Sequence, residues 1–141
     1  MATTTATLTL SSGDLTGDAL SLSTTTTLTK AGTATGLDQT TGVARKFYAS
    51  AQTATKLIDK ALYDDWAVST PVSHKVYIKN LSTTAAEYVA VQLNDGTNTI
   101  EIGHLYAGDF MLIPYDGKSD IEIDTSAVNM TVEHLVIYQD A

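Results

Sequence analysis

The sequence predicts an all-β protein, an antiparallel β-sandwich or barrel with an extended Thr/Leu-rich N-terminal segment. Threonine supplies about one residue in six, and charged residues make up only 17% of the chain, fewer than the ~25% of an average soluble domain. Threonine is β-branched and suits the pleated, half-exposed surface of a sheet. In addition, apolar and polar residues alternate in short segments through the second half. With 141 residues, the chain is long enough for one such core.

Residues 1–43 form the first predicted region, which is extended and rich in threonine and leucine. Leucine alternates with small polar residues in 7–10, 20–23 and 28–30, a period of two that is typical of a strand with one packed face. This apolar side is too small to complete a core alone. We therefore expect an interface with another subunit, and a disordered arm is the alternative. The candidate interface residues are Thr7, Leu8, Thr9, Leu10, Leu20, Leu22 and Leu28.

Residues 44–141 are predicted to form the sandwich domain, after a loop at 31–42 that has glycine near both ends. The segment 44–66 is ambiguous. Its apolar residues fit a helical stripe, and they also fit two strands joined around Ser50–Thr53. Because the chain on both sides resembles strands, we predict strands here. The residues that fit the helical stripe are Leu57, Ile58, Ala61, Leu62 and Trp66.

The strongest signal lies in 71–141, where six short strands alternate with polar turns at a spacing typical of a sandwich or barrel. Asn94-Asp95-Gly96 predicts a tight hairpin, because Asn and Gly accept positive φ. The last strand is expected to span about Met130 to Tyr138. The alternation predicts burial of Val76, Ile78, Val89, Val91, Ile100, Ile102, Ile121 and Ile123.

Residues 103–123, GHLYAGDFMLIPYDGKSDIEI, contain the residue types of an active site. The same residues are fully accounted for as three strands and two turns, so we interpret them as scaffold. Asp109 and Asp116 fall in the turns, and the alternatives of a calcium site or a glycosidase pair remain open for them. Asp120, Glu122 and Asp124 recur at every second position, which predicts one solvated face of a strand.

No motif for catalysis or metal binding is present. The chain has no cysteine, and His74, His104 and His134 lack the HxH or HExxH spacing of zinc ligands. No serine lies in a G-x-S-x-G elbow, and no glycine-rich phosphate loop occurs. We therefore predict that the protein is not an enzyme and uses no cofactor, metal ion or catalytic residue.

The charge distribution predicts which partners the protein avoids. The net charge is −8, of which residues 71–141 contribute −7, from ten acids and three lysines. This charge would repel nucleic acid. No apolar run approaches the ~18 residues of a membrane span, and the N-terminal residues lack the pattern of a secretory signal. We expect a soluble protein that is made in a cytoplasm.

Residues 75–138 resemble a module of small virion structural proteins from tailed bacteriophages, including marine and cyanobacterial phages. The likeness rests on VYIKN (76–80), on AGD (107–109) before an aromatic strand, and on a final strand with E-x-x-V (133–136). It implies a non-enzymatic role in the virion, either in decorating or cementing the capsid or in the tail. The expected partner is the major capsid protein, or tail proteins, and the expected location is the virion.

The sequence also predicts an oligomeric state and leaves an alternative function open. The Thr/Leu-rich region predicts a homo-oligomer, for which a trimer is the first expectation. The alternative function is a tail or tail-fibre-associated protein, or a carbohydrate-binding knob for host recognition, because tyrosine combines an apolar ring with a polar tip. The tyrosines in or beside predicted strands are Tyr77, Tyr88, Tyr106, Tyr115 and Tyr138.

Overall fold

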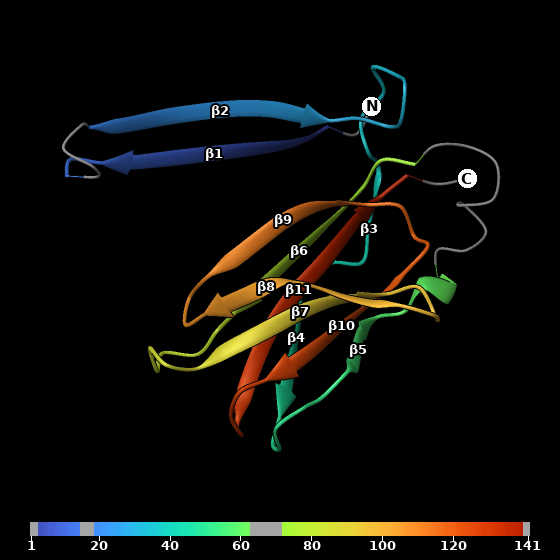
Figure 1. Ribbon diagram of the computed structural model, residues 1–141. Coiled ribbons are helices and arrows are strands. Elements are labelled where there is room, and N and C mark those ends of the chain that lie inside the picture. The colour runs from blue at the N-terminus through green and yellow to red at the C-terminus, as the bar shows by residue number, and fades with distance from the viewer. Residues whose placement is uncertain (1–2, 15–18, 63–71, 140–141) are drawn as a thin grey trace.

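A computed structural model describes residues 3–14, 19–62 and 72–139, and most of them lie in strands. The described strands form a separate hairpin and two antiparallel sheets (Figure 1). The buried apolar side chains of the two sheets form one cluster. The sheets do not join at their edges, so this part of the chain is a sandwich and not a closed barrel. The prediction of an all-β antiparallel fold is confirmed.

The first sheet contains the central pair of β11 and β6, which are antiparallel to each other. The strand β9 pairs with the other side of β6 and forms one edge. At the opposite edge, β3 and β4 pair with successive parts of β11. Because β3 belongs to residues 1–43, the chain joins the sandwich before residue 44. The strands are β3 (Gln39–Thr40), β4 (Ala44–Tyr48), β6 (His74–Asn80), β9 (Phe110–Tyr115) and β11 (Met130–Tyr138).

The second sheet has the strand order β5-β10-β7-β8, with β5 and β8 at its edges. The β7–β8 connection is the predicted Asn-Asp-Gly hairpin. Gly96 has a φ of 98°, and its N–H donates to Oδ1 of Asn94 at 2.8 Å. A short 3-10 helix, η2 (Lys60–Leu62), follows β5. The strands are β5 (Thr55–Ile58), β7 (Tyr88–Asn94), β8 (Thr99–Tyr106) and β10 (Asp120–Thr125).

The segment 44–66 contains two strands, as predicted, within its described residues. Tyr48 ends β4 and Thr55 begins β5, and the link between them is fixed to the end of β10. There, the N–H of Gln52 donates to Oγ1 of Thr125 at 2.8 Å, and the N–H of Thr125 donates to the carbonyl oxygen of Gln52 at 3.0 Å. Trp66 lies outside the described residues. Pairing with β11 and β10 therefore selects strands where local periodicity also allowed a helix.

The core lies between the two sheets and is built from the alternating residues of the second half. Six of the eight predicted core residues are completely buried: Val76, Ile78, Val89, Val91, Ile121 and Ile123. The prediction is wrong for Ile100 and Ile102, whose exposed fractions are 64% and 44%. Both belong to β8, an edge strand that has a neighbouring strand on one side only. A bulge in the β7–β8 pairing also leaves Ile102 without a partner residue in β7.

Candidate functional site

The most distinctive feature outside the core is the hairpin of β1 (Thr4–Ser12) and β2 (Leu20–Leu28), which we call the arm. The two strands pair with each other from Thr4 opposite Leu28 to Ser12 opposite Leu20, and they pair with neither sheet. Each strand is therefore paired along one side within the same chain, whereas the outer edges of β1 and β2 have no neighbouring strand among the described residues. The two faces of the arm carry the side chains through which it can contact a partner.

The register sorts the side chains of the arm onto two faces, because residues directly opposite each other in an antiparallel pair point the same way. One face, the leucine face, carries Ala6, Leu8, Leu10, Leu20, Leu22 and Leu28 together with a few small polar residues. The other, the hydroxyl face, contains serine and threonine alone. Its residues are Thr5, Thr7, Thr9, Ser11, Ser21, Ser23, Thr25 and Thr27.

Side-chain hydrogen bonds join hydroxyl groups of the two strands across the hydroxyl face. The Oγ1 atoms of Thr7 and Thr25 lie 3.0 Å apart, and Oγ1 of Thr9 lies 3.5 Å from Oγ of Ser23. Of the seven residues predicted for the interface, Thr7 and Thr9 therefore belong to this face. The five leucines belong to the opposite one.

The leucine face is buried at one end and exposed at the other. Leu28, at the base, is 6% exposed, and its carbonyl oxygen accepts a hydrogen bond from the N–H of the fully buried Leu37 at 2.8 Å. An ion pair at 2.9 Å between Nζ of Lys30 and Oδ2 of Asp38 holds the loop that follows. Further along the arm, four leucines are exposed by about two fifths each: Leu8, Leu10, Leu20 and Leu22. The protein's own sandwich thus covers the base of the arm only.

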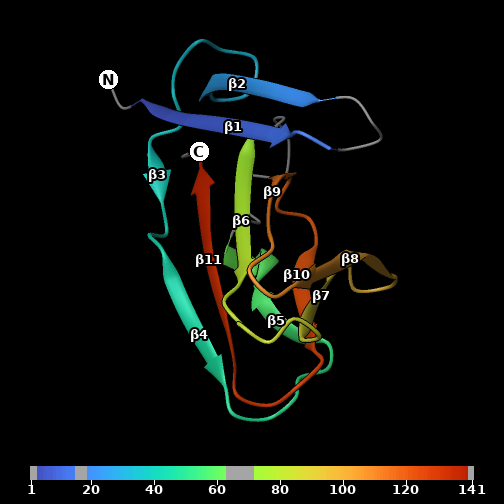
Figure 2. The same ribbon diagram turned by 90° about the vertical axis from the view of Figure 1, so that its left-hand side faces the viewer.

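The arm crosses the end of the first sheet, and its far end extends beyond the strands of the sandwich (Figures 1 and 2). Between its leucine face and β9 lies an open groove of about 630 Å³. The opposite wall carries Phe110 and Leu112, whose exposed fractions are 58% and 44%. The described residues that line the groove are mostly apolar: Ala6, Thr7, Leu8, Thr9, Thr24, Thr26, Leu28, Lys75, Phe110, Met111, Leu112, Ile113 and Pro114.

Lys75 is the single charged residue among the described residues that line this groove. Its Nζ donates to the carbonyl oxygen and to Oγ of Ser73, both at 2.9 Å. Burial lowers the pKa of Lys75 from its usual value, because an apolar environment disfavours the charged form. The ammonium group is therefore engaged within the chain. The groove can bind an apolar partner, but it presents no free charge that would select an ionic one.

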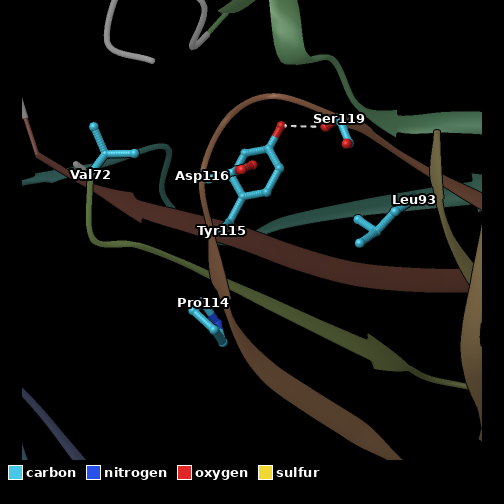
Figure 3. Close-up of a pocket in the computed structure, with 6 residues that line it drawn as sticks. All are labelled: Val72, Leu93, Pro114, Tyr115, Asp116 and Ser119. Atoms are coloured by element: carbon cyan, nitrogen blue, oxygen red, sulfur yellow. Dashed lines mark hydrogen bonds between the residues drawn. The ribbon is translucent and has the colours of Figure 1, made fainter. Parts of the chain in front are cut away.

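A second, smaller hollow of about 370 Å³ opens at one end of the core. Its lining residues include Val72 and Leu93, which lie on either side of the Tyr115 ring in Figure 3. The Tyr115 hydroxyl donates to the carbonyl oxygen of Ser119 at 2.8 Å, and Oδ1 of Asp116 accepts from the N–H of Lys118 at 3.0 Å. The polar groups of this hollow thus hold the turn after β9 in place.

The acidic residues considered as ligands or catalysts also bind the chain's own groups. Oδ2 of Asp109 accepts from the N–H of Tyr106 at 3.0 Å within the β8–β9 turn. In β10, Asp120 accepts from the N–H of Lys60, and Asp124 accepts from the N–H of Ala54. The prediction of a solvated row is wrong for Glu122, which is 8% exposed because the row packs beside β5 and β7.

The three histidines lie in different strands. His74 and His134 belong to β6 and β11 of the first sheet, whereas His104 belongs to β8 of the second. Burial, followed by the charge of Lys75, lowers the pKa of His74, and burial and the charge of Lys46 lower that of His134. Within 3–14, 19–62 and 72–139, no three residues of the His, Asp and Glu types lie close enough together to hold a metal ion.

An aromatic cluster that the alternation within single strands did not predict lies on the outer side of the second sheet. The rings of Tyr88 and His104 stack with their centroids 4.3 Å apart and an interplanar angle of 19°, and Tyr106 lies 5.6 Å from Tyr88. The β7–β8 register places Tyr88 directly opposite Tyr106. By contrast, Tyr115 lies in the core, and the Tyr77 hydroxyl donates to Oε1 of Glu133 at 3.1 Å.

Comparisons with known proteins identify no relative: no family model, no curated protein and no solved structure matches this chain. None of the helices among the described residues has the length and apolar character needed to cross a membrane.

Proposed function

We propose that the protein is a non-enzymatic virion structural protein, a decoration or cement protein on the head of a tailed phage. The observation that carries this proposal is the arm, whose leucine face extends away from the chain's own core. An isolated two-stranded hairpin is marginal in water, so an exposed leucine face of this kind favours a protein that works by contact with other subunits. The resemblance of residues 75–138 to virion structural proteins supports the same conclusion and makes the major capsid protein the expected partner.

The distribution of charge fits attachment through the side of the molecule that carries the arm. The outer face of the first sheet carries more basic than acidic residues, with Lys75, Lys79 and Arg45 against Glu133. The Arg45 guanidinium lies 2.8 Å from the Glu133 carboxylate and lowers the pKa of Glu133. The acidic row of β10 lies on the second sheet instead. A decoration protein attached by its first sheet would direct its acids away from the capsid. Many weak contacts of this kind, summed over a capsid lattice, would strengthen the head.

Virions grown from the genome that encodes this chain test the proposal directly. We expect mass spectrometry of separated heads and tails to find the protein in heads, in many copies per particle. Deleting its gene should yield heads that release DNA at a lower temperature than wild-type heads, because the contacts across coat subunits are lost. If the protein occurs in tails, the tail-associated alternative replaces this proposal. If it is absent from purified virions, a virion role is wrong.

The aromatic cluster favours a second candidate function, the binding of carbohydrate during host recognition. Sugars stack their apolar faces on aromatic rings, and Tyr106 is 46% exposed beside the stacked Tyr88 and His104. Two carboxylates near the cluster can accept hydrogen bonds from sugar hydroxyls. Oε1 of Glu101 lies 3.2 Å from Nε2 of His104. Asp124 of β10 lies opposite Ala90 of β7, and Ala90 lies opposite His104 of β8. The cluster is therefore a candidate platform for one or two sugar units.

A glycan array screened with the purified protein tests this second function. We expect a bound glycan to lose affinity by about tenfold or more in Tyr106→Ala, because the stacking ring is removed. Tyr106→Phe keeps the ring and should retain most of the binding. An array without any bound glycan, or equal losses in the two variants, would contradict the carbohydrate function.

A further inference from the structure

We propose that the arm of one copy packs against the arm of a second copy, leucine face to leucine face, and that this contact makes a two-fold dimer. The inference rests on the proposed function in one respect, because it takes the arm to be a docking element. It goes further by naming the partner surface. The partner is the same face of an identical chain.

The need for a covering layer follows from the position of the four exposed leucines. They lie on the part of the arm beyond Leu28, and two strands alone do not form an independently stable sheet in water. A second hairpin stacked about 10 Å away would supply the missing layer and convert the arm into a small four-stranded sandwich. Within the part of the chain that the structure describes, no element of the same copy lies over these leucines closely enough to bury them.

The leucine face has the shape needed to pack on a copy of itself. On the leucine face, three successive rows carry one, two and one leucine, and in each outer row the leucine lies beside a small hydroxyl residue. When the face is turned over onto its own copy, a leucine of one arm can fit into the space above the small residue of the other. Close packing of large against small side chains is the arrangement found in protein cores. The rows are Leu8 opposite Thr24, Leu10 opposite Leu22 and Ser12 opposite Leu20.

Electrostatics favours a second copy as the occupant over a partner with a charged surface. Neither arm strand, 4–12 or 20–28, contains a charged residue, whereas the whole chain carries −8. Two copies therefore repel each other through their sandwiches and can approach most closely through their neutral arms. A charged partner would lose hydration at this face and gain no ion pair in return.

The contact also fixes the number of copies. When the same face is used on both partners, the contact is isologous and closes at two subunits. The trimer expected from the sequence needs a different arrangement, in which each arm meets two others. The structure favours the dimer because each arm has one apolar face, and its other face carries hydroxyl residues alone.

The test compares two variants that add the same charge to adjacent residues on opposite faces. In the full-length protein, Leu10→Glu places a carboxylate in the contact, and Thr9→Glu places it on the hydroxyl face at the same distance along the arm. We expect the wild type and Thr9→Glu to sediment as dimers in analytical ultracentrifugation. Leu10→Glu should sediment as a monomer, with a dissociation constant raised at least about tenfold. Unchanged thermal unfolding of the sandwich in both variants shows that the fold is intact.

A cross-link provides a second readout, because the chain has no cysteine of its own. With a bismaleimide whose spacer spans about 10 Å, the separation of stacked sheets, Leu10→Cys should form a cross-linked dimer rapidly, and Thr9→Cys should form it at least about tenfold more slowly. A monomeric wild type, a trimer, or equal behaviour of the two faces in both experiments would overturn the proposal. These outcomes are independent of the virion assay. A chain found in heads but monomeric in solution refutes the dimer alone, and a dimer absent from virions refutes the virion function alone.

Discussion

Ile78→Ala is expected to lower the free energy of unfolding by about 2–5 kcal/mol, the range for truncating a buried isoleucine to alanine. Ile78 is completely buried in β6, where its partners are His134 of β11 and Met111 of β9. Because strands pair with β6 on both sides and the second sheet packs on its inner face, the neighbours cannot collapse fully into the space left by the truncated side chain. Urea denaturation followed by far-ultraviolet circular dichroism measures the change.

Ile100→Ala is the matched control for this measurement. Both residues are isoleucines in β-strands, but Ile100 is 64% exposed in the edge strand β8. We expect its truncation to change the free energy of unfolding by no more than about 0.5 kcal/mol. Equal losses in the two variants would mean that β8 is covered in the native protein, and would contradict the distinction between the buried core and the exposed edge strand.

Substitution of Asn80 is expected to have the second large effect. This residue ends β6 and is completely buried. Its Nδ2 donates to the carbonyl oxygens of Leu105 and Glu87, at 3.0 and 3.2 Å, and its Oδ1 accepts from the N–H of Ser82 at 2.9 Å. One amide side chain thus connects the end of the first sheet to β8 of the second sheet and to the turn before β7.

Asn80→Ala should cost about 2–4 kcal/mol of unfolding free energy, because it leaves buried carbonyl and N–H groups without their partners. Asn80→Asp keeps the shape and can still accept from Ser82, but at pH 7 it places a buried carboxylate against two carbonyl oxygens. We expect this variant to be at least as destabilised as the alanine variant, and to recover stability when acid protonates the new carboxyl group. Thermal unfolding of both variants at pH 7 and pH 5 measures this. An aspartate variant as stable as the wild type at pH 7 would show that the two hydrogen bonds donated by Asn80 Nδ2 do not form.

The sequence by itself determined most of the second half of the fold. Apolar residues at every second position predicted six strands in 71–141, and within 72–139 the structure contains six, β6 to β11. The last strand spans the predicted Met130 to Tyr138, and Gly96 adopts the positive φ that the Asn-Asp-Gly turn requires. These features were predictable because a strand's period and a tight turn's backbone angles depend on neighbouring residues alone.

The tertiary structure decided what depends on the position of a strand within its sheet. Ile100 and Ile102 have the same alternation as Ile121 and Ile123, yet they are exposed because β8 lies at an edge and contains a bulge, whereas β10 lies between two strands. The stack of Tyr88 on His104 also depends on which residues of β7 and β8 are opposite each other. Periodicity within one strand carries no information about its neighbours.

The arm shows the same division most clearly. The alternation of leucine with threonine and serine was evident in the sequence, and it separated leucine from hydroxyl residues within each strand. Whether the leucines of the two strands share a face depends on their register, in which Leu10 lies opposite Leu22. A shift of one residue would have moved the leucines of β2 to the opposite face from those of β1. The sequence therefore determined that the arm has apolar residues, and the pairing of β1 with β2 decided that they form one surface.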